Sequence, residues 1–163
     1  MRIRITAITL TQLIAAPIFA AVSTANLNVT ASVGASCTIT TLPVAFGAYD
    51  PVGSNLSAPL NGTGTVTVSC TRGAAATVDL GNGSNFGSAS RRMSSGGDFL
   101  GYALYKDSAR TQVWGSGMAG GSTTSYFALT KGATALTVYG AVPQAQDVGV
   151  GSYSDSIVAN INY

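Results

Sequence analysis

Short runs in which apolar and polar residues alternate are the feature that most restricts how this chain can fold. From Asn26 to Val33 the odd positions are apolar and the even positions polar, and Gly64 to Cys70 (GTVTVSC) alternates in the same way. A two-residue period is that of a β-strand with one face against a core and the other in water. Further strands are predicted over residues 35–42, 76–83, 99–115, 125–130, 133–143 and 155–163.

The composition favours strands and turns over helices. The chain contains 20 Gly and no Glu, and no segment shows a sustained 3.6-residue apolar period. Helix formers are therefore scarce, whereas Gly, Thr, Ser and Val, which are typical of turns and strands, are abundant. Short strands separated by Gly-rich turns predict an all-β protein, a two-sheet β-sandwich in a single domain.

The first residues have the features of a secretory signal peptide. Arg2 and Arg4 precede an apolar run, and small residues between positions 20 and 25 offer cleavage sites. The alternative is a membrane anchor, but the run is short for a bilayer span of roughly 20 residues and polar residues interrupt it. We therefore expect residues 1–25 to be a signal peptide that is cleaved between residues 20 and 25.

Charge gives no support to a nucleic-acid partner. Without Arg2 and Arg4, the chain keeps six basic residues and six Asp, so its net charge is zero. Binding to nucleic acid or to an anionic membrane requires a basic patch. A neutral, sparsely charged surface suits a protein that ends in an assembly, because little repulsion keeps copies apart.

Residues suited to catalysis or to metal binding are scarce. The chain has no His, and an Asp in a turn usually caps its own backbone. Cys37 and Cys70 in an exported chain predict one disulfide, with free thiols as the alternative. We therefore expect that the chain is not an enzyme and binds neither a metal nor a cofactor. We expect its six Asp residues to have structural roles: Asp50, Asp79, Asp98, Asp107, Asp147 and Asp155.

The most distinctive local unit is the segment from Phe99 to Gly115. An apolar face at Leu100, Tyr102 and Leu104 is followed by the polar sequence KDSAR and then by TQVWG, which predicts a β-hairpin with a five-residue loop. We expect Tyr102 and Trp114 to pack in the core rather than to form a sugar-stacking platform, and Tyr105 to be half exposed.

The segment before this hairpin, residues 83–98, is rich in Gly and Ser and is expected to contain little regular structure. It carries Arg91 and Arg92. Two adjacent arginines in a loop are usually solvated, and binding of an acidic partner is the less favoured alternative.

The predicted strand at Asn26–Val33 raises the question of what covers its apolar face. Three residues separate Val33 from Cys37, so the strand could fold back as a tight hairpin at Gly34 but could not reach across the sheet. The last predicted strand, residues 155–163, ends with no sequence left for a further strand beside it. A sandwich with an uncovered edge and a separate amphipathic strand favours strand exchange between copies.

The order of several short sequences resembles the spore coat protein U domain family, which includes subunits of archaic (Csu-type) chaperone–usher pili. The matching sequences are ASCTI after the alternating strand, TVSC at the second cysteine, YALYKDSART, VYGAVP and the closing YSDSIVANINY. The resemblance extends over essentially all of the chain after the predicted signal peptide.

The resemblance implies an incomplete immunoglobulin-like β-sandwich over residues 35–163 that is completed by donor-strand exchange. The donor strand would be residues 26–34, with Leu27, Val29, Ala31 and Val33 as the inserted side chains. The last strand would help to form the acceptor groove through Ile157, Ala159, Ile161 and Tyr163. Cys37 and Cys70 match the disulfide pair of the family. Ala31 is small for such a position, so its pocket is expected to be shallow.

The resemblance also implies partners and a location. A periplasmic chaperone would lend the missing strand, an outer-membrane usher would assemble the subunits, and other copies or related subunits would follow in a fibre at the cell surface that supports adhesion or biofilm formation. One alternative is a spore or cell-surface coat protein of the same family. Another is a carbohydrate-binding β-sandwich adhesin, although a tip adhesin normally carries a second domain and needs no donor strand.

Overall fold

The computed structural model describes residues 17–163; residues 1–16, which hold much of the predicted signal peptide, lie outside the described residues. The chain divides into two units, residues 1–32 and 33–163. Residues 17–36 form neither a helix nor a strand. The predicted strand at Asn26–Val33 is therefore absent as a paired element, and Leu27, Val29 and Val33 are each more than 80% exposed (88%, 86% and 84%).

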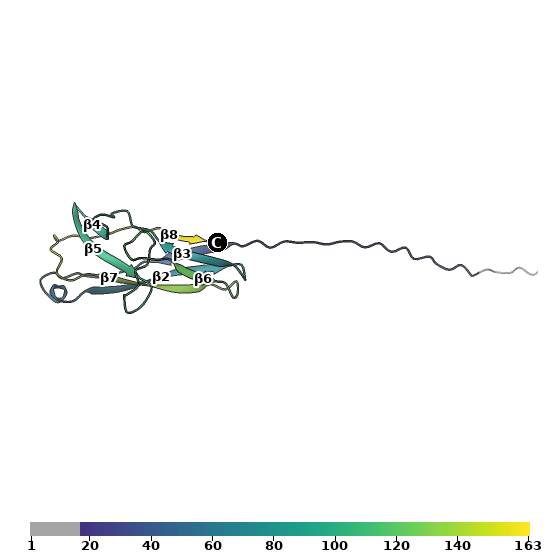
Figure 1. Ribbon diagram of the computed structural model, residues 1–163, viewed down its shortest axis with the longest axis horizontal. Helices are drawn as coiled ribbons and strands as arrows, with labels where there is room; N and C mark the ends of the chain where they lie inside the picture. Colours follow the sequence, from purple (N-terminus) through teal and green to yellow (C-terminus); the bar gives the residue numbers. More distant parts are fainter. Residues whose placement is uncertain (1–16) are drawn as a thin grey trace, which may run out of the picture. The chain divides into compact units, whose positions relative to one another are not determined.

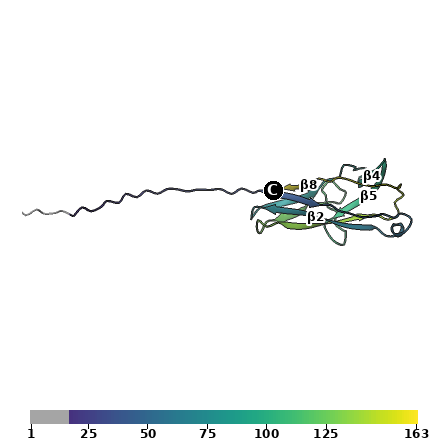
Figure 2. The same cartoon turned by 180° about the vertical axis from the view of Figure 1, so that it is seen from behind.

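The second unit is a β-sandwich of two antiparallel sheets (Figures 1 and 2). One sheet has the order β1-β2-β7-β5-β4 and the other has the order β6-β3-β8. A 3₁₀ turn at Ser54–Leu56 precedes β2. Among residues 17–163 there is no helix with the length and apolarity that crossing a membrane requires. The strands are β1 (Cys37–Leu42), β2 (Leu60–Cys70), β3 (Ala75–Leu80), β4 (Arg91–Ser95), β5 (Asp98–Tyr105), β6 (Thr124–Phe127), β7 (Thr134–Val142) and β8 (Ala159–Asn162).

The core lies between the sheets and is built from the alternating positions. Val66 and Val68 of β2 face inward while the intervening threonines are half exposed. The predicted inner face of β5 is confirmed, because Leu100, Tyr102 and Leu104 are all buried. Trp114 is 1% exposed and its indole N–H donates to the carbonyl of Val78 at 3.0 Å, which satisfies the polar edge of a buried aromatic ring.

The predicted hairpin after β5 is confirmed, although its returning arm is a short bridge rather than a full strand. Tyr105 pairs with Val113, and the backbone N–H of Lys106 donates to the carbonyl of Gln112 at 2.9 Å. Asp107 closes the loop, because its carboxylate accepts bonds from the backbone N–H groups of Thr111 and Gln112. Tyr105 is half exposed, as predicted.

The expectation that residues 83–98 contain little regular structure is wrong at its centre. Residues Arg91–Ser95 form β4, which pairs with β5 from Arg91↔Tyr102 to Ser95↔Asp98. The alternation of this strand turns Arg91 inward, where it is 0% exposed, and leaves Arg92 half exposed over the ring of Phe99. The expected solvation of both arginines is therefore wrong for Arg91.

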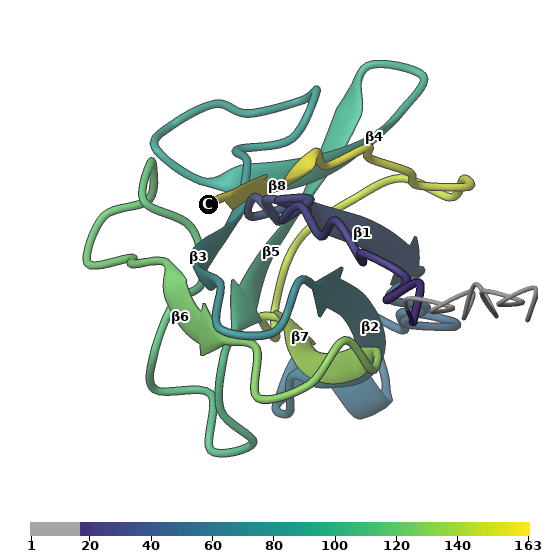
Figure 3. The same cartoon turned by 90° about the vertical axis from the view of Figure 1, so that its right-hand side faces the viewer.

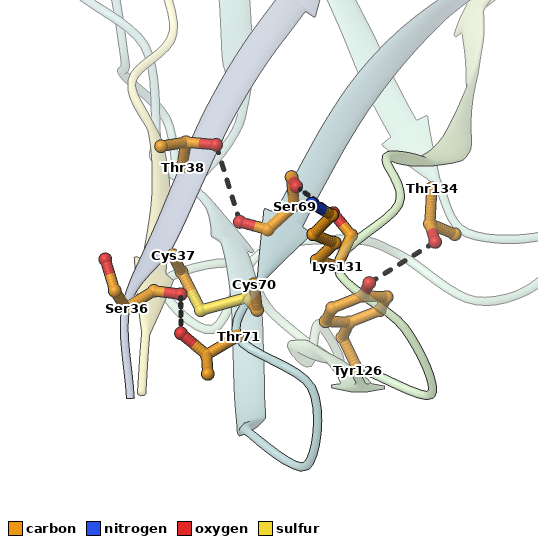
Figure 4. The surroundings of a disulfide bond; sticks show 9 residues. All are labelled: Ser36, Cys37, Thr38, Ser69, Cys70, Thr71, Tyr126, Lys131 and Thr134. Carbon is orange, nitrogen blue, oxygen red and sulfur yellow. Dashed lines mark hydrogen bonds between the residues drawn. A yellow bond between two sulfur atoms is a disulfide. The ribbon is translucent and has the colours of Figure 1, made fainter. Parts of the chain in front are cut away.

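The disulfide joins Cys37 at the start of β1 to Cys70 at the end of β2 (Figure 4). The two cysteines are also direct cross-strand partners, so the bond locks the register of this pair of strands. Hydroxyl groups around it bind backbone carbonyls: Thr38 donates to Ser69, and Ser69 donates to Lys131 at 2.8 Å.

Candidate functional site: an open groove between two sheet edges

Two neighbouring strand edges in the sandwich have no partner between them. β1 lies at one edge of the larger sheet and β8 lies at one edge of the smaller sheet. Their Cα atoms approach within 8 Å, and the view along the domain places them side by side (Figure 3). No pairing joins them within the described residues. Each strand therefore directs one side of its backbone, with its N–H and C=O groups, toward the gap.

The segment that leads into β8, residues 154–158, is hydrogen-bonded only along the side that faces away from β1. The backbone of Ser154 exchanges hydrogen bonds with Ser94 of β4, the carbonyl of Ser156 accepts from Ser84, and the carbonyl of Val158 accepts from Gly81 at 2.9 Å. Pairing with β3 then continues through β8. The segment is thus held in an extended conformation without using the edge that faces β1.

The two edges run in opposite directions. Every step from β1 through β2, β7, β5 and β4 is antiparallel, and the bridge from Ser94 to Ser154 is antiparallel as well. The terminal segment consequently runs opposite to β1. A strand inserted between them would be parallel to one edge and antiparallel to the other.

The floor between these edges is hollow and largely apolar. A cavity of about 320 Å³ opens there, and core residues of both sheets form its floor. Leu42 and Val44 line one side of it, and Ile157 and Ala159 line the other. A second cavity of about 670 Å³ continues from it beneath the loop after β1, and the two share four lining residues: Val44, Phe46, Met93 and Tyr153.

The predicted apolar face of the last strand is present. Ile157, Ala159 and Ile161 are half buried against the core, whereas the intervening Val158 is 66% exposed. Tyr163 is 60% exposed, so it stands apart from the other three. Ile157 and Ala159 line the smaller cavity. Whether these residues accept a donor strand stays a prediction.

One wall of the groove is fixed by a polar contact. The hydroxyl of Tyr102 donates to Oδ2 of Asp155 at 2.6 Å, and both residues line the smaller cavity. Burial, followed by the hydrogen bond to Asp155, raises the pKa of the Tyr102 hydroxyl far above its ordinary value. Tyr102 therefore remains a protonated donor across the physiological range of pH.

Behind this wall lies a buried arginine that sequence reasoning missed. The guanidinium of Arg91 makes four hydrogen bonds, all to backbone carbonyls: two to Gly81, one to Leu80 and one to Trp114. Burial lowers the pKa of Arg91, and the charges of Tyr102, Asp79 and Asp155 oppose that shift. The side chain connects β4 to the end of β3 and to the Trp114 segment. Apolar periodicity gave no signal for it, because a charged residue occupies the inward position.

The carboxylates have mainly structural roles. Asp50 accepts the backbone N–H groups of Val52 and Gly53, Asp98 accepts that of Gly149, and Asp79 accepts both N–H and hydroxyl bonds from Ser116. The predicted capping of the local backbone is present at Asp50, whereas Asp98 and Asp79 instead bind segments that are distant in the sequence. No group of three or more metal-ligating side chains is gathered anywhere in residues 17–163.

Comparisons with known proteins agree with this architecture. The profile of the Spore Coat Protein U domain matches residues 23–160. The chain is 37% identical over 161 residues to Protein U of Myxococcus xanthus, with 90% of this chain and 88% of that protein covered. The chain belongs to the Spore Coat Protein U domain family. The resemblance found in the sequence is thereby confirmed, and the family is a structural, non-enzymatic one.

A solved structure supports the fold. The chain is similar to one in the crystal structure of the CsuC–CsuE chaperone–tip adhesion subunit pre-assembly complex, from archaic chaperone–usher Csu pili of Acinetobacter baumannii. The TM-score is 0.52 at 20% identity, and the match covers 79% of this chain and 40% of the other. The domain is accordingly an all-β sandwich of the immunoglobulin-like kind that occurs in pilus subunits.

Proposed function

We propose that this chain is the structural subunit of a surface fibre of the chaperone–usher type, and that it polymerises by donor-strand complementation. The segment from Asn26 to Val33 of one copy fills the groove between β1 and β8 of another. The observation that carries the proposal is the pair of unpaired edges over an apolar floor, in a chain that also has an exposed segment of matching alternation. Backbone bonds to the edges and side chains in the hollow floor are the two requirements of strand addition.

The energy of insertion is adequate for a durable joint. Leu27, Val29 and Val33 are exposed in the single chain, and burying them contributes on the order of 5–9 kcal/mol before ordering is counted. Main-chain hydrogen bonds along the strand add to this. Slow dissociation would make the joint more persistent than its equilibrium stability alone suggests.

The route to the surface follows from the same groove. An open apolar groove in a free subunit invites aggregation, so a periplasmic chaperone that occupies it with a strand of its own is a suitable first partner. The similar solved structure is itself a chaperone–subunit complex. An outer-membrane usher would then exchange the chaperone strand for that of the next copy. We place residues 1–25 as the signal peptide and the fibre at the cell surface, where it supports adhesion or biofilm formation.

Deletion of residues 26–33 tests the proposal. We expect the shortened protein to be exported and to remain bound to its chaperone but to form no fibres in electron micrographs. Addition of a peptide with the sequence of residues 26–33 should release the chaperone and leave a soluble, complemented monomer. Fibres of normal length from the deletion variant would contradict strand exchange.

A second candidate is a coat protein that assembles through the same joint. It is favoured by the 37% identity to Protein U and by the name of the family. Electron microscopy of producing cells separates the candidates, because a fibre subunit gives thin filaments whereas a coat protein gives a continuous layer.

A further inference from the structure

We propose that successive copies also stack end to end, through two ends of the sandwich that carry opposite charge. This inference rests on the proposed strand exchange and adds to it an interface between folded domains. The partner is a second copy of this chain, and the two contact surfaces lie at opposite ends of β2 (Figure 1). Eleven strand residues separate these ends by about 33 Å.

The first surface, here called the disulfide end, surrounds Cys37 and Cys70. It consists of Ser36, the turn at residues 71–74 and the segment at residues 127–131. The N–H of Thr71 donates to the carbonyl of Ser36 at 2.8 Å, and the N–H of Gly73 donates to that of Ala128 at 2.8 Å. Figure 4 shows Lys131 beside this disulfide.

The disulfide end is basic and partly apolar. Arg72 and Lys131 are exposed on it. Leu129 is 77% exposed and Phe127 is 57% exposed. Large apolar side chains of this kind are common at interfaces and are costly to leave in water in a group.

The second surface, here called the loop end, is made by residues 49–58, 95–98 and 143–151. The hydroxyl of Tyr49 accepts the N–H of Gln146 at 3.0 Å, and the N–H of Ala145 donates to the carbonyl of Asn55 at 2.8 Å. These hydrogen bonds join loops that are far apart in the sequence into one surface.

The loop end is acidic and also partly apolar. Its charged side chains within the described residues are Asp50, Asp98 and Asp147, all exposed. Val52 and Val150 stand out from it, and both are almost fully exposed. Arg92, on the strand that leads to residues 95–98, lies over the ring of Phe99 and donates to the carbonyl of Asn85.

The opposite charges of the two ends favour one arrangement of neighbouring copies. A disulfide end placed against a loop end brings basic side chains to acidic ones, whereas two like ends repel each other. Only a contact between a disulfide end and a loop end can be repeated without limit in one direction, as a fibre requires.

The linker makes this contact obligatory. Val33 and Cys37 are separated by three residues, and four peptide units span about 14 Å at most. The domain that follows an inserted segment must therefore lie directly against the end where that segment leaves the groove. If the segment leaves at the loop end, it runs parallel to β1, and the basic disulfide end of its own domain meets an acidic surface. The reverse direction would press two basic ends together.

Zero-length cross-linking of fibres tests the stack. A carbodiimide joins a lysine amine to a carboxylate only when the two are in contact, and we use fibres made from mixed ¹⁴N- and ¹⁵N-labelled chains. We expect mixed-isotope peptides that link Lys131 to Asp50, Asp98 or Asp147. Lys106 is the internal control, because it lies away from both ends and binds Ser122 and Thr123. Fibres that give no Lys131 link to these residues would overturn the stacking and leave strand exchange intact.

Charge reversal gives an independent test. Lys131→Glu and Asp147→Lys should each slow fibre growth roughly threefold to tenfold, while the double variant should regain most of the lost rate. Lys106→Glu changes the net charge equally and should leave growth close to normal. Binding of the residue 26–33 peptide should be unchanged in all of them, since these side chains do not line the groove. Equal slowing by Lys106→Glu, or no recovery in the double variant, would contradict the stack.

Discussion

The hydroxyl of Tyr102, in the middle of β5, donates a 2.6 Å hydrogen bond to Oδ2 of Asp155, at the start of the segment that leads to β8. The other carboxylate oxygen of Asp155 accepts both the backbone and the side-chain N–H of Asn85 at 3.1 Å. A core residue of one sheet therefore holds the wall of the groove that belongs to the other sheet. The shape of the groove depends on this partly buried polar contact as well as on apolar packing.

The first prediction concerns this contact. Tyr102→Phe keeps the ring in the core and removes only the hydroxyl, so Asp155 loses one of its three hydrogen bonds. We expect the free energy of unfolding to fall by about 1–3 kcal/mol, measured by urea denaturation of the purified protein. Tyr153→Phe is the matched control, because its hydroxyl donates to Gly149 in an exposed setting and its loss should change stability by less than about 0.5 kcal/mol. Equal effects of the two changes would contradict the role given to Tyr102.

The second prediction concerns the buried arginine. Arg91→Met fills similar space but leaves the carbonyls of Leu80, Gly81 and Trp114 without their donor. We expect a loss of about 3 kcal/mol or more in the free energy of unfolding, since each unsatisfied buried group is costly. Arg92→Met removes the cation–π contact with Phe99 and a hydrogen bond to the carbonyl of Asn85 at the half-exposed side of the strand, and should lose about 1–2 kcal/mol. Thermal unfolding of the two variants side by side decides this prediction, and similar melting temperatures would refute it.

These two sites also show where sequence reasoning succeeded and where it could not. Local alternation predicted the inner faces of β2 and β5, because the two-residue period of a strand can be recognised from adjacent residues alone. It failed at β4, where Arg-Arg-Met-Ser-Ser has no apolar period. The inward position of that strand is satisfied by carbonyls from residues 80, 81 and 114, which are distant in the sequence.

The groove itself was predictable only in outline. The sequence contains an apolar face at Ile157, Ala159 and Ile161 and a separate amphipathic segment at Asn26–Val33, which together suggested strand exchange. It could not place β1 opposite that edge, since β1 and the segment leading into β8 are connected through four successive strand pairings and one bridge across the domain. Nor did it predict the charge difference between the two ends, which depends on loops that meet only in the folded chain.

The third prediction concerns pH. The backbone N–H of Gln112, followed by the hydroxyl and the N–H of Thr111, lowers the pKa of Asp107 below its ordinary value. A lowered pKa in the folded state means that the ionised carboxylate stabilises the hairpin above the ordinary pKa of Asp, about 3.9, and that this stabilisation is lost as the pH falls below it. Asp107→Asn should therefore flatten the decline in stability below about pH 4.

Unfolding followed as a function of pH measures this effect. Thr111→Val, which removes one donor to the carboxylate, should give an intermediate profile. Ser108→Ala, in the same loop, should give the profile of the unmodified chain. A profile of Asp107→Asn that matches the unmodified chain would show that this carboxylate does not contribute to the acid dependence.

The fourth prediction tests the register of the donor strand with two single variants, each of which adds one carboxylate. Val29→Asp places a carboxylate on the apolar face that we propose enters the groove, whereas Asn28→Asp places one on the opposite face. Losing the burial of a valine alone corresponds to about 1.5–3 kcal/mol, and an unpaired charge in the groove adds to it. Peptides of residues 26–33 should therefore bind a chain lacking that segment at least about 10-fold more weakly with Val29→Asp, and almost normally with Asn28→Asp. A shift of one residue exchanges the two faces of a strand. The reverse order of affinities would therefore mean that Asn28 and its even-numbered neighbours face the groove. Equal weakening by the two changes would mean that neither face is buried.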